Sequence, residues 1–305
     1  ALVGAKILGP RIGKYNKDGS ANAIPGHNIT VGALGVFILW VCWFGFNGCS
    51  TVSMTGDDNI MLAGSVFVTT NIAAAAATVT TMIFTWVKYK KPDVSMTLNG
   101  SLAGLVAITA GCAVVNPVGA CIIGIVAGIA VVVAIEFIDQ KLKIDDPVGA
   151  IGVHGVCGAI GTILTGVFAV DGGLAYGGGA HLLGVQTLGV VSVIAGVVVT
   201  TTVLFKAIDA TLGRRVTEEE EVVGLDKLEH GLTSAYADFA KASTVRKLKT
   251  EAEKVSVDKA VPVQLVSKSA SSDVGASDIK LTKIEIITDQ DKFKDLKDAL
   301  SEIGI

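Results

Sequence analysis

The chain has 305 residues, of which 50% are hydrophobic and 17% charged, and its formal net charge is −3. No charged residue occurs in five long stretches, which are residues 29–56, 59–87, 97–135, 147–170 and 172–205. A soluble domain would need polar faces on its helices, and these stretches have almost none. The composition therefore excludes a soluble globular protein and predicts an all-α polytopic membrane protein.

The uncharged stretches define six membrane spans. A helix needs about 20 mostly apolar residues to cross ~30 Å of hydrocarbon, and Asn116-Pro117 divides the longest stretch into two such helices. The predicted spans are residues 29–50, 60–87, 97–115, 117–138, 147–169 and 184–205. Residues 1–8 look like the end of a further span, so we expect the chain to begin partway through a longer protein.

Basic and non-basic loops alternate along the chain. The basic segments are those before the first span, after the second, after the fourth and after the last. Because Lys and Arg concentrate on the cytoplasmic side, both ends of the chain are predicted to lie in the cytoplasm. The spans are rich in small residues, as in Ile72 to Thr81 (IAAAAATVTT). Small residues let helices approach closely in lipid, so the spans should form a packed bundle.

Trp43, Phe46 and Ser50 form a candidate cation site. They follow one another at i, i+3 and i+7 near the outer end of the first span, so they share one helix face. Aromatic faces attract ammonium-type cations, and a hydroxyl oxygen accepts a hydrogen bond from one. The alternative is an aromatic belt at the membrane surface, which is common in membrane proteins.

His154 is the candidate pore residue. It lies in an uncharged span, about 10 Å from the cytoplasmic end at Pro147. An ionisable side chain at that depth is costly unless it faces protein or a cavity. The alternative is a structural histidine whose hydrogen bonds are satisfied by a backbone carbonyl or by a neighbouring helix. Nearby glycines (Gly152, Gly155 and Gly158) favour the cavity, and Cys157 alone gives too few ligands for a metal site. We expect no cofactor.

Five motifs then resemble the Amt/Mep/Rh ammonium transporters. They are Ala1 to Arg11 (ALVGAKILGPR), Trp43 to Asn47 (WFGFN), Leu98 to Cys112 (LNGSLAGLVAITAGC), Gly152 to Gly158 (GVHGVCG), and Gly213 to Asp226 with Glu229 to Gly231. They occur in the family's order, and the match runs from residue 1 to about residue 237.

The resemblance implies an eleven-span subunit with its own pore in a homotrimer. His154 would be the second pore histidine, Phe46 a gating phenylalanine, and Trp43 with Ser50 the outer recruitment site. A membrane domain over residues 1–236 would end in a cytoplasmic tail, 206–236, that couples subunits. The matching tail residues are Gly213, Arg215, Glu219, Gly224, Asp226, Glu229 and His230.

The chain also departs from the family pattern. The first five spans are missing apart from the end of the fifth, and with them the partner pore histidine, a second gating phenylalanine and an outer-site aspartate. Many members have an aspartate five residues before the pore histidine, where this chain has Gly149. We therefore expect the conducting unit to be a longer protein.

The C-terminal segment changes character. Residues 237–278 are polar and predict a flexible linker. Residues 279–305 predict one strand and one helix, and Leu281 to Gly304 resembles the start of the PII signalling proteins, which are ferredoxin-like regulators of nitrogen uptake. The alternative is a generic βα unit. We expect a PII domain that is completed in the full-length protein.

These observations favour transport of ammonium or ammonia, with methylammonium as an analogue, by a multi-pass protein of the cell membrane. The expected partners are the lipid bilayer, two further copies of the chain, and a PII-type regulator in cis or in trans; no nucleic acid is expected. The alternative is an ammonium sensor that signals through its tail. An intramembrane enzyme is disfavoured, because the spans hold no carboxylate–histidine or serine–histidine constellation.

Overall fold

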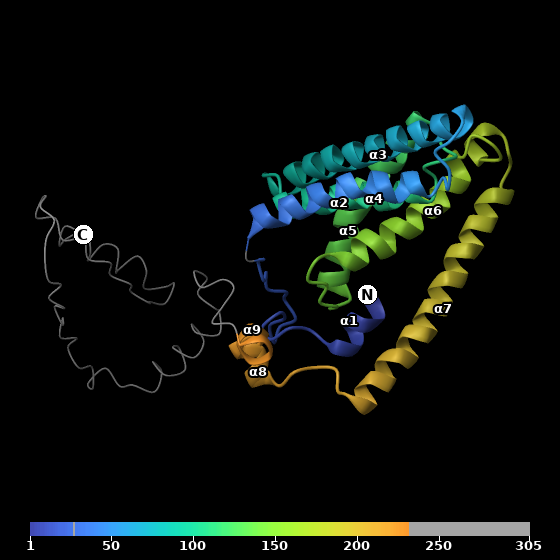
Figure 1. The fold of residues 1–305 in the computed structure, drawn as a ribbon. Coiled ribbons are helices and arrows are strands. Elements are labelled where there is room, and N and C mark those ends of the chain that lie inside the picture. Colours follow the sequence, from blue (N-terminus) through green and yellow to red (C-terminus); the bar gives the residue numbers. More distant parts are fainter. Residues whose placement is uncertain (27, 232–305) are drawn as a thin grey trace, which may run out of the picture. The chain divides into compact units, whose positions relative to one another are not determined.

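The computed structural model describes residues 1–26 and 28–231 (Figure 1). The predicted linker (237–278) and βα unit (279–305) lie outside the described residues. The elements in chain order are α1 (Leu2–Leu8), α2 (Ile29–Cys49), α3 (Asp57–Tyr89), α4 (Val94–Thr109), α5 (Pro117–Glu136), η1 (Phe137–Lys141), η2 (Ile151–Val156), α6 (Cys157–Phe168), η3 (Leu174–Tyr176), α7 (His181–Thr211), α8 (Glu218–Val223) and α9 (Leu225–His230). Both η1 and η2 are π-helical, and η3 is a 3₁₀ turn.

Five helical segments of the described chain are long and apolar enough to cross a membrane. They are residues 29–49, 57–89, 117–141, 151–168 and 181–211. The helix at the remaining predicted span, residues 97–115, is shorter. This helix, α4, has 16 residues and ends at Thr109 rather than at residue 115. It ends there because the chain turns at Gly111, where a Cβ would lie 2.7 Å from the Thr165 hydroxyl of α6. Val115 then pairs with Ala169 in an isolated β-bridge.

Short polar side chains begin three of the helices. Asn28 accepts hydrogen bonds from the backbone N–H groups at the start of α2, and Asp93 does the same for α4. Asn116 caps α5, with Pro117 at its first position. Each cap satisfies backbone donors that a helix start leaves unpaired. The Asn116-Pro117 pair that the sequence indicates as a break between spans is therefore a helix start.

Helices α3, α4 and α5 pack against one another through small residues, and run side by side in Figure 1. A Cβ on Gly104 of α4 would lie 2.5 Å from the Ala73 carbonyl oxygen of α3, and one on Gly124 of α5 would lie 2.4 Å from the same atom. Thr81 of α3 donates a hydrogen bond to the Gly128 carbonyl of α5. The poly-alanine stretch of α3 is thus held between two glycine-bearing helices, as the small-residue pattern predicts.

The other helices leave long apolar surfaces uncovered. None of the residues of α7 is buried, although α7 packs against α6 and α1. Gly4 of α1 lies against the Phe205 ring of α7, 2.8 Å from where a Cβ would be. An apolar helix of 31 residues with no buried residue needs lipid or other helices to cover its surface.

The close packing on Ala73 makes a prediction for stability. In the full-length protein in detergent, Gly124→Ala should lower the thermal unfolding temperature, because overpacking costs about 1–3 kcal/mol. The matched control is Gly64→Ala, since Gly64 lies in α3 and a Cβ there meets no atom within 4 Å. That change should be neutral or slightly stabilising, since Ala favours a helix over Gly by up to about 1 kcal/mol. Equal shifts in both variants would contradict the packing argument.

Candidate functional site

The aromatic cluster consists of Trp43 and Phe46 on the last turns of α2 and Ser50 at its C-cap. The rings of Trp43 and Phe46 meet edge to face, with centroids 5.6 Å apart. The Ser50 hydroxyl donates to the Phe46 carbonyl at 2.7 Å, and Trp43 Nε1 donates to Thr109 Oγ1 at 2.9 Å. The Phe46 side chain is 58% exposed, so its ring is open to a ligand. The structure therefore brings these residues together on one face, as their spacing predicts.

Buried contacts hold this end of α2 against α3. Asn47 is buried and its amide donates to the Thr70 hydroxyl at 3.0 Å. Gly48 lets the helices approach, because a Cβ there would lie 2.4 Å from the Phe67 ring. Trp40 Nε1 donates to Asn71 at 3.2 Å. The aromatic cluster is therefore carried by a fixed helix rather than by a loop.

Hydrogen-bond direction determines what the aromatic cluster offers a ligand. The single proton of Ser50 goes to the Phe46 carbonyl, and the single N–H of the Trp43 indole goes to Thr109. What remains is the lone pairs of Ser50 and the aromatic faces. A ligand that only donates hydrogen bonds and carries positive charge matches both.

His154 lies on the π-helical segment η2, directly before α6. Its side chain is exposed, and no hydrogen bond joins it to any other residue of the described chain. A Cβ on Gly155 would make an ordinary contact with Ile151, at 3.8 Å, whereas a Cβ on Gly152 would lie 2.7 Å from the Ile135 side chain. Short π-helical segments occur preferentially at functional sites. In the described residues the imidazole ring is thus exposed and donates no hydrogen bond to a backbone carbonyl.

Asp146 fixes the start of η2. Its two carboxylate oxygens accept the backbone N–H groups of Ala150 and Ile151 at 2.9 and 2.7 Å. Gly149 before them has φ +72°, a left-handed conformation that favours glycine. A Cβ there would also lie 3.0 Å from the Asn99 amide. Asp146 therefore performs the capping role that its place before the span predicts.

Asp145, the neighbour of Asp146, is a buried ion-pair residue rather than a helix cap. Its side chain is 3% exposed and forms a bidentate ion pair with Arg11, at 2.7 and 2.9 Å. The Arg11 backbone N–H donates a third bond at 3.0 Å. Burial alone would raise the pKa of Asp145, but these bonds and the positive charge of Arg11 outweigh it and hold the pKa below its usual range.

A second ion pair lies beside the first. Lys14, which is buried, contacts Asp139 of η1 at 2.9 Å. The Tyr15 hydroxyl donates to the same carboxylate at 3.0 Å. Burial and this bond to the negatively charged Asp139 raise the pKa of Tyr15. The segment that precedes α2 is thus fixed to the segments at the end of α5 and before η2.

The tail is joined to the same segment through Arg215 and Glu221. The guanidinium of Arg215 donates to the carbonyls of Leu8 and Pro10 at 3.1 and 2.8 Å, and to Glu221. The Glu221 carboxylate also accepts the backbone N–H of Ile12 at 2.8 Å. Arg215 is therefore a predicted tail residue whose contacts reach the segment before α2.

The other predicted tail residues are placed differently. Gly213 and Gly224 have φ +77° and +93°, so both positions require glycine. Glu219 is exposed on α8, and Asp226, Glu229 and His230 belong to α9, where Glu229 and His230 are exposed. The residue that sequence reasoning missed is Glu221. It stands in a run of four glutamates, and nothing in that run distinguishes it.

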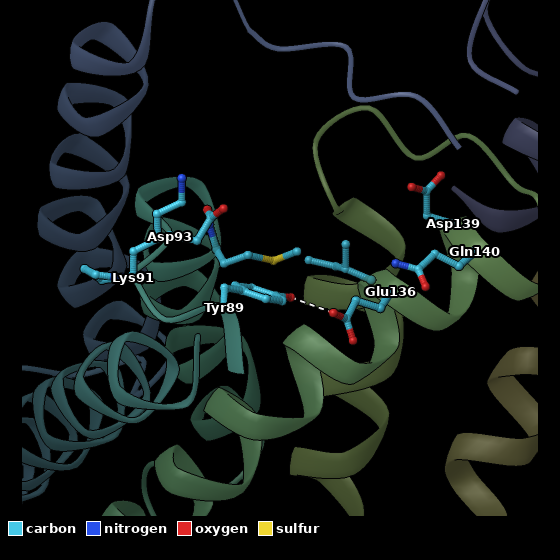
Figure 2. Close-up of a pocket in the computed structure, with 9 residues that line it drawn as sticks. Tyr89, Lys91, Asp93, Glu136, Asp139 and Gln140 are labelled. Atoms are coloured by element: carbon cyan, nitrogen blue, oxygen red, sulfur yellow. Dashed lines mark hydrogen bonds between the residues drawn. The ribbon is translucent and has the colours of Figure 1, made fainter. Parts of the chain in front are cut away.

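A pocket of about 370 Å³ lies beside η1, between the α3–α4 connection and the end of α5 (Figure 2). The carboxylates around it are already engaged. Glu136 accepts from the Tyr89 hydroxyl at 2.6 Å and pairs with Lys88, and Asp93 caps α4. Asp139 is bound by Lys14 as described. The pocket therefore offers no free carboxylate for a cation. In the described chain, no group of three or more His, Cys, Asp or Glu could hold a metal ion.

Comparisons with known proteins agree with the resemblance of the motifs. A profile described as the Ammonium Transporter Family matches residues 1–236. Ammonium transporter Amt2 of Archaeoglobus fulgidus is 42% identical over 257 residues, which covers 80% of this chain and 53% of that protein. Ammonium transporter Amt1 of Haloferax mediterranei is 38% identical and covers 78% of this chain and 46% of that protein.

A solved structure titled "Sensor Amt Protein" is also similar. It shares 43% identity and superposes with a TM-score of 0.70 over 75% of this chain and 56% of that chain. This chain therefore spans about half the length of the relatives that it matches.

The Arg11–Asp145 pair predicts a pH-dependent contribution to stability. Asp145→Asn should lower the free energy of unfolding by about 1–3 kcal/mol, less than for a fully buried pair, because the Arg11 side chain is 37% exposed. A lowered pKa stabilises the fold above the unfolded value of about 3.9. The unfolding temperature of Asp145→Asn should therefore lie furthest below that of wild type near neutral pH. The difference should shrink as the pH falls below about 4.

The control for this measurement is Asp171→Asn, since Asp171 is an exposed loop aspartate. It should leave the unfolding temperature unchanged at every pH. A constant difference between Asp145→Asn and wild type down to acid pH would contradict the assigned pairing.

Proposed function

The chain belongs to the ammonium transporter family, a family of transporters and not of enzymes, and we propose that it forms the outer recruitment site and one wall of a pore for ammonium or ammonia. Over the described residues it is an all-α, multi-pass membrane protein. Because it spans about half of its relatives, transport is proposed for the complete protein.

The observation that carries the proposal is the chemistry of the aromatic cluster. Ammonium has four N–H donors, a positive charge and no lone pair. The cluster offers the faces of Trp43 and Phe46 and the lone pairs of Ser50, while its own donors are used internally. Cation–π attraction and an oxygen acceptor therefore bind the protonated species. The aromatic-belt alternative does not require this arrangement of donors.

His154 acts at the next step of the proposed path. A full charge in an apolar passage is costly, so ammonium releases a proton to water at the exposed cluster, and the neutral species moves on past Phe46. The neutral imidazole has one donor and one acceptor nitrogen, so it can hydrogen-bond ammonia inside the pore. The exposed imidazole ring supports this role.

The cytoplasmic parts of the proposal concern assembly and regulation. We place both chain ends in the cytoplasm, on the evidence of the alternating basic loops. In a homotrimer, the tail residues Gly213 to His230 couple the subunits, and the bonds of Arg215 support a tail that stays docked. Residues 279–305, after the linker, start a PII-like regulatory module, which the sequence pattern alone supports.

A second candidate function is ammonium sensing. The relative titled "Sensor Amt Protein" is 43% identical to this chain. The bonds from Arg215 and Glu221 to the segment before α2 offer a physical connection from the membrane part to the tail. Flux through the full-length protein in vesicles separates the two functions, because a pure sensor binds ammonium without conducting it.

The recruitment site predicts a change in affinity. In the full-length protein, Trp43→Leu should raise the KM for methylammonium about two- to thirtyfold, since a cation–π contact contributes about 0.5–2 kcal/mol. Ser50→Ala should act in the same direction, with a smaller effect on the maximal rate than on KM. Trp86→Leu is the control, because Trp86 is an exposed aromatic on α3, away from the cluster. An unchanged KM in Trp43→Leu would favour the aromatic belt.

The pore role of His154 makes a separate prediction. His154→Ala in the full-length protein should abolish or alter methylammonium uptake while the protein still assembles, because alanine can neither donate nor accept a hydrogen bond. His181→Ala, at the exposed start of α7, is the matched control and should transport normally. Wild-type uptake by His154→Ala at equal expression would refute the assignment.

A further inference from the structure

We infer that Thr109 is a positioning residue that sets the specificity of the aromatic cluster, because its hydroxyl takes up the Trp43 indole N–H and leaves only the ring face to a ligand. This inference rests on the proposed recruitment role of Trp43. Thr109 comes from a different helix, and its own position in the sequence gives no sign of the contact.

The direction of the bond is determined by the geometry around Thr109. Its hydroxyl oxygen lies 2.7 Å from the Leu105 carbonyl, to which it can only donate, and 2.9 Å from Trp43 Nε1, from which it can only accept. A threonine hydroxyl has one proton. With that proton on the Leu105 carbonyl, the oxygen is oriented as an acceptor for the indole. The indole N–H thus donates to the Thr109 hydroxyl, which in turn donates to the Leu105 carbonyl, so both hydrogen bonds run in one direction.

These two hydrogen bonds fix the orientation of the indole ring. Trp43 is half-buried and meets Phe46 edge to face at 86°. Rotation of the indole about its side-chain bonds would break the bond to Thr109 and leave the N–H without its partner, which costs free energy. Thr109 ends α4, so the anchor sits on a helix that also packs against α3 and α5. The ring face is thereby held ready before a ligand arrives, which improves affinity.

The same bond also excludes competing ligands. Water and ammonia have lone pairs and would bind to a free indole N–H, whereas ammonium has none. With the N–H occupied by Thr109, the cluster presents aromatic faces and the acceptor Ser50, and it offers no donor of its own. Thr109 therefore makes the cluster select the protonated species over the neutral one.

The neighbouring indole provides a matched comparison. Trp40 stands one helical turn before Trp43 and donates its N–H to Asn71 of α3 at 3.2 Å. Both bonds hold a tryptophan of α2 against another helix, but only the bond of Trp43 belongs to the aromatic cluster. Loss of the Asn71 bond should perturb packing as much as loss of the Thr109 bond, without changing recruitment.

The experiment compares Thr109→Val, Thr109→Ser and Asn71→Leu in the full-length protein, with methylammonium uptake as the assay. Thr109→Val should raise KM about two- to tenfold, the factor that one hydrogen bond supplies, and leave the maximal rate nearly unchanged. Thr109→Ser keeps the hydroxyl and should restore the wild-type KM. Asn71→Leu should keep that KM as well. If Thr109→Val does not fold, Thr109→Ala removes the hydroxyl without an added methyl group.

A second readout tests specificity directly. For wild type, KM expressed as ammonium ion should vary less with pH than in Thr109→Val, where the freed N–H also binds ammonia and lowers the apparent KM as the pH rises. Parallel pH profiles in both proteins, or an equal rise of KM in Thr109→Ser, would overturn the role of Thr109. An unchanged KM in Trp43→Leu would instead refute the recruitment site itself, so the two failures are distinguishable.

Discussion

The close approach of α3, α4 and α5 is the constraint on which the rest of the described structure depends. In hydrocarbon, helices gain little from apolar burial against one another, so backbone-to-backbone contact between small residues must hold them together. Gly104 and Gly124 provide it by meeting the same carbonyl of Ala73. Helix α4 then packs against both α2 and η2. Thr109, its last residue, contacts the aromatic cluster, and other residues of α4 contact η2, the segment of His154.

Polar contacts join the segments that connect these helices. The connection from α5 to α6 bears two adjacent aspartates with different tasks. Asp145 binds Arg11 of the segment before α2, while Asp146 caps the π-helix of His154. Glu221 of the tail bonds to Ile12, next to Arg11, so hydrogen bonds and the backbone between them connect the tail to η2. Packed and hydrogen-bonded contacts of this kind are one way in which two sites can be coupled.

Much of the chemistry at the outer end lies in hydrogen-bond direction rather than in residue type. Tryptophan, serine and threonine each carry a donor, yet all three donors are committed within the protein. The result is a site of acceptors and aromatic faces, which complements a cation that only donates. A composition of this kind also suits an aromatic belt at the membrane surface.

The sequence by itself determined the helical class and the family, and the comparisons confirm the family. Five of the six predicted spans coincide with helices of the described chain that are long and apolar enough to cross a membrane. The sequence also predicted that Trp43, Phe46 and Ser50 share a face, because helical periodicity depends only on spacing. The tertiary structure alone decided which faces meet. Thr109 lies 66 residues from Trp43, and Asp145 lies 134 from Arg11. Periodicity identifies the side of a helix that is buried but not its neighbour, so these partners, and Glu221 among four glutamates, follow only from the packing of the helices.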